Sequence, residues 1–215
     1  MKKKSAVLKN SLILFLYLLI IWGFYRSLFH LPEEIEEVIV KPILWLFPVF
    51  YLVRREGKSL KSLGLTRKNL FPAIALSLAL GIVFVVEGLI LNYVKYQGFN
   101  FGANIGDKPL FLAIAISFVT AFVEEVTFRG YIFTRLWQGF KNEFFANFVT
   151  SAAWVIIHIP ITVFVLKLDF SQTLVFLGLA GVFSLGTSFI FARTKNIFSS
   201  VFLHVLWQWP IILFR

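Results

Sequence analysis

The sequence of 215 residues contains no cysteine, which excludes disulfide bonds, thiolate metal sites and cysteine nucleophiles. Charged residues are also scarce, at 15% of the chain against about 25% in an ordinary globular domain. Apolar residues make up 59%, and the mean hydropathy is +0.83, so the polar side chains are too few to cover a water-facing surface. These values exclude a soluble protein and predict an integral membrane protein.

Seven apolar runs approach the length of about 20 residues that a bilayer-spanning helix needs. They cover residues 11–29, 38–53, 70–93, 110–136, 144–166, 174–191 and 199–214. We therefore predict an all-α fold, a polytopic transmembrane bundle of about seven (six to eight) helices that forms a single integral-membrane domain over residues 1–215. The run 38–53 is short, so this helix is tilted, re-entrant or longer than its hydropathy indicates.

Lysine and arginine side chains favour one side of this bundle. If the N-terminus is inside, the inner segments hold 14 of the 21 Lys and Arg residues and the outer segments hold 6. Because cytoplasmic loops are enriched in Lys and Arg, the bias predicts a cytoplasmic N-terminus. The same rule accounts for the net charge of +10 without nucleic acid, which we do not expect as a partner. We expect a multi-pass protein of the plasma (inner) membrane, surrounded by the lipid bilayer.

Ionisable side chains inside the fourth apolar run indicate a structural or functional role, because placing each of them in lipid costs several kcal/mol of free energy. Glu125 and Arg129 are four residues apart, share a helix face and can pair. Glu124 lies about 100° around the helix and has no arginine at that spacing. This arrangement suits Glu124 to act as a general base. The alternative is a structural ion pair with a spare glutamate.

Two histidines lie in later apolar runs. His158 follows Trp154 by four residues, so the indole can stack on or shield the imidazole. His204 precedes Gln208 by four residues, so both polar side chains leave one helix face and could hold a developing oxyanion. Taken alone, His158 fits a structural hydrogen bond better than a catalytic role, and His204 fits the two equally well. Counting residues from the helix ends places these groups and Glu124 below the midplane, and we expect them to meet in a site open to the cytoplasm.

These residues resemble the motifs of the CPBP family of intramembrane proteases, the CAAX protease and bacteriocin-processing (Abi) family. The resemblance rests on Glu124-Glu125-x-x-x-Arg129, on Trp154-x-x-x-His158 and on His204-x-x-x-Gln208, in this order over about 85 residues. Two positions depart from the family pattern, which usually has Phe at position 154 and Asn at position 208.

The resemblance implies an intramembrane endopeptidase with a catalytic core over about residues 110–212. By that resemblance, Glu124 activates the attacking water with help from His158, while His204 and Gln208 stabilise the oxyanion. Glu125 and Arg129 support the helix geometry, and Trp154 forms an aromatic wall. The expected substrate is a small membrane-associated peptide or a prenylated peptide.

Metal dependence stays open at this point, because the family is often described as metalloproteases. Glu124, His158 and His204 are the candidate ligands for zinc, the one cofactor that the pattern leaves open. Their spacing is not that of H-E-x-x-H zinc proteases, so the sequence does not require a metal.

Two other functions fit the sequence. A non-catalytic immunity or assembly partner could keep the protease fold, and Gln208 favours it because its amide lies one methylene further out than asparagine. A proton-coupled transporter could use Glu87, Glu124 and the histidines as a relay, although the chain shows no internal repeat.

Overall fold

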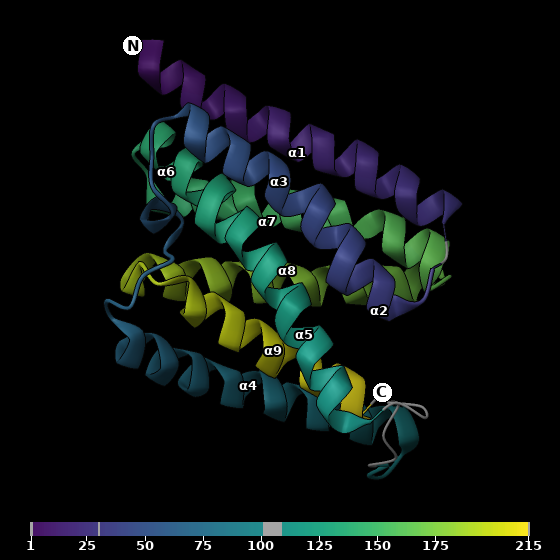
Figure 1. Ribbon diagram of the computed structural model, residues 1–215. Helices are drawn as coiled ribbons and strands as arrows, with labels where there is room; N and C mark the ends of the chain where they lie inside the picture. The colour runs from purple at the N-terminus through teal and green to yellow at the C-terminus, as the bar shows by residue number, and fades with distance from the viewer. Residues whose placement is uncertain (1, 30, 101–108, 215) are drawn as a thin grey trace.

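The computed structural model describes residues 2–29, 31–100 and 109–214 and is shown in Figure 1. Within these ranges the chain is helical with no strand, which confirms the predicted all-α transmembrane bundle. Five helical stretches are long and apolar enough to cross a membrane: Ala6–Leu28, Leu70–Tyr96, Phe111–Phe140, Glu143–Val165 and Phe170–Thr194.

The described elements form seven helical rods. The first is α1 (Lys2–Leu28), and the second joins α2 (Glu33–Ile35), the π-helical turn η1 (Glu36–Val40) and α3 (Lys41–Arg55). A 3-10 turn, η2 (Leu60–Leu63), leads to α4 (Leu70–Tyr96). The fourth rod joins α5 (Leu110–Glu125), the π-helical segment η3 (Val126–Phe133) and α6 (Thr134–Phe140). The rest are α7 (Glu143–Pro160) with η4 (Ile161–Val165), α8 (Phe170–Thr194) and α9 (Ile197–Phe214).

The second rod is longer than the apolar run that predicted it. Hydropathy marks residues 38–53, but the helix begins at Glu33, because its first turns contain buried glutamates that pair with basic side chains. A hydropathy window averages these charges as if they faced lipid, and so it misses the start of the helix. Of the three alternatives that the sequence left open for this run, the structure shows a helix longer than its hydropathy indicates.

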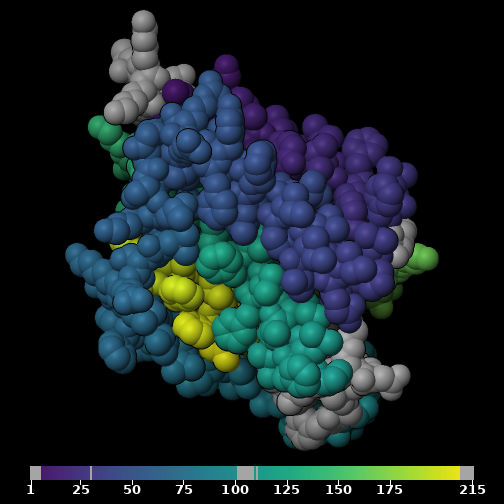
Figure 2. Space-filling model, in the orientation of Figure 1, coloured from purple at the N-terminus to yellow at the C-terminus, as the bar shows by residue number. Residues whose placement is uncertain are grey.

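The rods run between two ends of the bundle, as Figure 1 shows. The N-terminus, the α3–α4 connection, the α6–α7 turn and the α8–α9 turn lie at one end, which we call the basic end. The α1–α2 connection, the start of α5 and the η4–α8 connection lie at the opposite end. In the space-filling view of Figure 2, α9 (yellow) is visible between α4 (blue) and α5 (teal).

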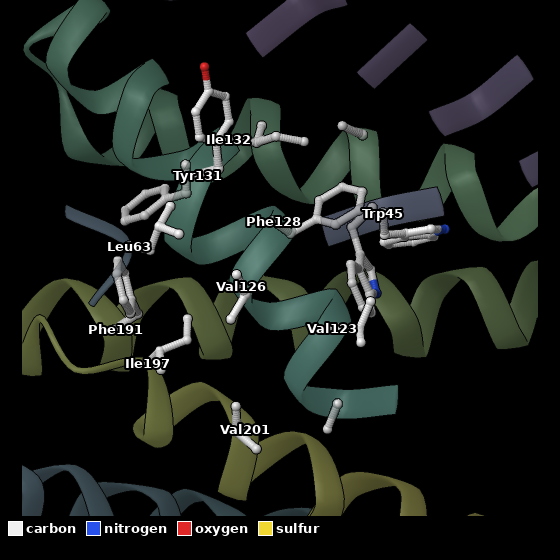
Figure 3. Packing of buried hydrophobic residues seen from close by; sticks show 14 of the residues in the cluster. Trp45, Leu63, Val123, Val126, Phe128, Tyr131, Ile132, Phe191, Ile197 and Val201 are labelled. Carbon is white, nitrogen blue, oxygen red and sulfur yellow. The ribbon is translucent and has the colours of Figure 1, made fainter. Parts of the chain in front are cut away.

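Aromatic packing fixes η3 at the centre of the bundle. Phe128 contacts Trp45 of α3, with ring centroids 5.9 Å apart (Figure 3), and meets Trp154 of α7 edge to face at 4.9 Å. On its other side, Gly130 lets η2 pack closely, because a Cβ there would lie 2.9 Å from the carbonyl oxygen of Leu63. All eight residues of η3 are buried, and π-helical turns are frequent near functional sites.

Candidate active site

Glu124 lies near the middle of the fourth rod and is 5% exposed. Its Oε1 is ion-paired with the Nζ of Lys41, which is 4% exposed and comes from the start of α3. Lys41 also binds Oε2 of Glu37 at 2.7 Å, and the hydroxyl of Thr120 donates to the same oxygen at 2.8 Å. The sequence predicted no arginine at helical spacing from Glu124, and it did not identify Lys41, from a different rod, as the partner of Glu124.

Glu125 forms the predicted pair with Arg129, with Nη1 at 3.1 Å from Oε1 and both side chains fully buried. Arg129 also donates to the Ser184 hydroxyl at 2.7 Å and lies 4.5 Å from the Trp154 ring centre, a cation–π contact. The supporting roles of Glu125 and Arg129 stay predictions, which these contacts favour. The pair spans α5, η3 and α8, and it fixes the helix that carries Glu124.

His204 is connected to both glutamates. Its Nδ1 lies 2.8 Å from Oε1 of Glu125, and because a carboxylate only accepts, Nδ1 carries the hydrogen. Its Nε2 lies 3.9 Å from Oε2 of Glu124, too far for a direct hydrogen bond. The contact with Glu125 was not predicted from the sequence. It holds the imidazole so that Nε2 faces Glu124.

His158 is oriented by the backbone of its own helix. Its Nδ1 lies 2.7 Å from the carbonyl oxygen of Trp154, so Nδ1 donates and Nε2 is left to accept a proton. The Trp154 and His158 rings are in contact at 4.6 Å between centroids, tilted by 45°. The predicted shielding of the imidazole by Trp154 therefore has a geometric basis.

Gln208 is oriented by a residue that sequence reasoning did not select. The hydroxyl of Ser117 on α5 donates to Oε1 of Gln208 at 2.6 Å. This bond occupies the amide oxygen and leaves the amide NH₂ group to donate elsewhere. The extra methylene of glutamine is thus accommodated by a specific contact.

A cavity of about 540 Å³ brings the polar groups together. Its lining includes all four predicted catalytic residues, namely Glu124, His158, His204 and Gln208. Apolar side chains such as Ile116, Phe176 and Trp207 form much of the remaining wall, and a volume of this size suits a small ligand or a short peptide segment.

Residues 106–210, which contain the four predicted catalytic residues, match the family described as type II CAAX prenyl endopeptidase Rce1-like. The match covers 105 of the 215 residues, just under half of the chain, and we call residues 106–210 the Rce1-like region. No curated protein and no solved structure matches the chain.

The Rce1-like region contains every predicted catalytic residue but not the whole site. Lys41 and Glu37 lie on the second rod, far before residue 106, and Lys41 pairs with Glu124 while Glu37 pairs with Lys41. The sequence feature that could have identified them is the spacing of four residues between Glu37 and Lys41, beside an apolar run. The same spacing also suits a solvated helix, and so it does not point to the site by itself.

The candidate zinc ligands of this Rce1-like site do not form a metal site. Among the residues that the structure describes, no three His, Cys, Asp or Glu side chains gather closely enough to hold a metal ion. The Lys41 ammonium group contacts Glu124, and a second cation there would be repelled. We therefore derive no step through a metal.

The cavity of the Rce1-like region does not open where the sequence predicted. Its lining reaches Leu31 and Glu33 after α1 and Leu166 after η4, all of them exposed, at the end opposite the basic end. Glu124 lies mid-helix because η3 and α6 extend the rod to Phe140. The sequence analysis placed the opening at the end of the bundle that carries the N-terminus, whereas the lining reaches exposed residues at the other end.

Removing Lys41 tests whether its charge compensates the buried carboxylates. Lys41→Met leaves Glu37 and Glu124 without their shared cation, and we expect the free energy of unfolding to fall by about 2 kcal/mol. We expect a smaller loss of stability than for an ion pair that water cannot reach, because water can enter this cavity. Thermal unfolding in detergent measures it, with Lys41→Met/Glu37→Gln expected to recover part of the loss. No recovery would show that Lys41 acts through packing instead.

Proposed function

We propose that this multi-pass membrane protein is an intramembrane endopeptidase that hydrolyses a peptide bond in a small membrane-associated peptide. The observation that carries the proposal is one cavity lined by Glu124, His158, His204 and Gln208, all from the Rce1-like region. Prenylated peptides are one substrate class that the family description suggests. We further propose a plasma (inner) membrane location and a catalytic core over residues 110–212 within a single domain.

The proposed reaction begins with a water molecule beside Glu124. The Glu124 carboxylate takes a proton from the water, and the water oxygen forms a bond to the peptide carbonyl carbon. Nε2 of His158 is the second proton acceptor in the cavity, because Nδ1 donates to Trp154. The C–N bond then breaks, and the proton held by Glu124 passes to the leaving amine.

The carbonyl oxygen carries the developing negative charge, and two groups can stabilise it. The amide NH₂ of Gln208 is free to donate because Ser117 occupies the amide oxygen. His204 can donate from Nε2 once it is an imidazolium, and the Glu125 carboxylate at 2.8 Å stabilises that charge. Such fixed donors in a water-poor site are usually the largest single contribution to catalysis.

The roles of Gln208 and Ser117 can be separated by their kinetics. Gln208→Ala removes an oxyanion donor, and we expect kcat to fall by about 100-fold or more. Ser117→Ala removes only the bond that orients the amide, worth about 1 kcal/mol, and we expect a loss of about 5-fold. Rates on one cleavable peptide measure both. Equal losses, or none for Gln208→Ala, would remove Gln208 from the oxyanion site.

A non-catalytic partner protein is the second candidate function. The ion pair between Lys41 and Glu124 favours it, because a nearby cation weakens the carboxylate as a base. In that case Glu124→Gln would leave the biological phenotype unchanged.

The deciding experiment compares membranes that contain wild-type protein with membranes that contain Glu124→Gln at equal abundance. Mass spectrometry of peptides and new termini should find fragments with the wild type that are lost with the variant. Those fragments would also identify the substrate. If no fragment differs and the phenotype survives the substitution, the chain is a binding partner built on a protease fold.

A further inference from the structure

The two ends of the bundle differ sharply in basic residues. The basic end of the bundle carries most of them: Lys2, Lys3, Lys4, Lys9, Arg54, Arg55, Lys58, Lys61, Arg67, Lys68, Arg135, Lys141, Arg193 and Lys195. Among those of them whose side chains the structure describes, only Arg135 is buried, in an ion pair with Glu56. The positive-inside rule places such an end in the cytoplasm.

At the opposite end, two of the basic residues are buried, so they do not add positive charge to the surface there. Arg26 and Lys41 are 7% and 4% exposed, and they pair with Glu36 and Glu37 inside the protein. Among the described residues of that end, Lys95 and Lys167 are the basic side chains exposed to solvent. The contrast between the two ends is therefore larger than the sequence alone indicated.

The cavity containing Glu124 opens at this opposite end. Exposed Leu31 and Leu166 line its mouth, together with Glu33, while none of the exposed basic residues of the basic end lines it. Toward the basic end, α3 of the second rod and η3 of the fourth rod close the path with buried aromatic packing around Trp45 and Phe128. A substrate reaches Glu124 from the mouth without crossing that packing.

We infer that the site takes its substrate from the extracytoplasmic side of the membrane. The inference rests on the proposed function and narrows its substrate class to an apolar peptide segment that is exposed on, or has been carried to, that side. A prenylated C-terminus that stays in the cytosol would face the basic end and would not reach the mouth. The apolar wall and the size of the cavity fit a short unfolded stretch of peptide.

Single cysteines test the orientation directly, because the chain has none of its own. Ser171 at the start of α8 and Ser59 before η2 are both exposed, lie at opposite ends and make no side-chain hydrogen bond to a described residue. In intact cells, a membrane-impermeant maleimide should label Ser171→Cys and not Ser59→Cys. Ser59→Cys should react only after permeabilisation. Labelling of Ser59→Cys, of both or of neither in intact cells would overturn the inference.

Cleavage from each side tests access to the site. An internally quenched apolar peptide attached to dextran, so that it cannot cross the bilayer, is added to right-side-out or inside-out vesicles. Glu124-dependent cleavage should occur only in right-side-out vesicles. Cleavage only in inside-out vesicles would overturn the inference and keep the protease. If Ser171→Cys is labelled from outside but neither vesicle cleaves any peptide, the proposed function fails while the orientation stands.

Discussion

Replacing Glu124 with glutamine is expected to lower peptide hydrolysis by about 10³-fold, because the amide cannot take a proton from water. The substitution is nearly isosteric, and Lys41 keeps its bond to Glu37 at 2.7 Å, so the variant should still fold. The measurement is the single-turnover rate on an identified substrate in detergent or vesicles. Folding is checked by comparing the unfolding temperatures of the two proteins.

Glu87→Gln is the matched control for this experiment. It makes the same chemical change on an intramembrane helix, α4, but Glu87 does not line the cavity. We expect its hydrolysis rate to stay within about 2-fold of the wild type, since surface or remote changes rarely alter a site. A loss with Glu87→Gln equal to that with Glu124→Gln would show that the effect is not specific to the carboxylate in the cavity.

Replacing Arg129 with glutamine is expected to cost about 3–5 kcal/mol of stability, because Glu125 would be left as a buried, uncompensated charge. Both side chains are 0% exposed, and the bond to Ser184 and the contact with Trp154 are lost as well. For a chain of this size, the change should lower Tm by about 10 °C or more. Thermal unfolding in detergent, followed by tryptophan fluorescence or by aggregation, measures the shift.

Arg193→Gln gives the comparison for Arg129. Arg193 pairs with Glu143 at 2.6 Å, but their side chains are 42% and 21% exposed. Water screens such a pair, so the expected loss is below about 1 kcal/mol. Similar Tm values for the two variants would mean that the Arg129 pair is not a dry, obligatory contact.

The bundle itself could be predicted from hydropathy because each lipid-facing helix must be apolar along most of its length. The second rod was the exception, since Glu36 and Glu37 are buried against basic partners, and pairing between helices is invisible to a window along one helix. The residues of the proposed active site could be selected because ionisable groups in apolar helices are costly. Lys41 and Ser117 could not, because each gains its role from a distant helix.

The direction of the opening depended on an element that hydropathy describes poorly. Counting from the apolar run 110–136 places Glu124 toward the inner end, but η3 and α6 continue the rod to Phe140. The polar side chains therefore meet near mid-height, and the loops around Leu31 and Leu166 decide which end the cavity reaches. Such loop packing has no periodic signal in the sequence.

Because Lys41 and Glu37 contribute to the site from outside the Rce1-like region, two parts of the sequence can accept substitutions with different consequences. The acid, the histidines and the amide lie in the region that matches the Rce1-like family, whereas the counter-charge and one wall of the cavity come from the N-terminal rods outside it. Substitutions in α1 to α3 can therefore reshape what the cavity accepts while every reacting group stays in place. In this architecture, the chemistry and the choice of substrate can diverge independently.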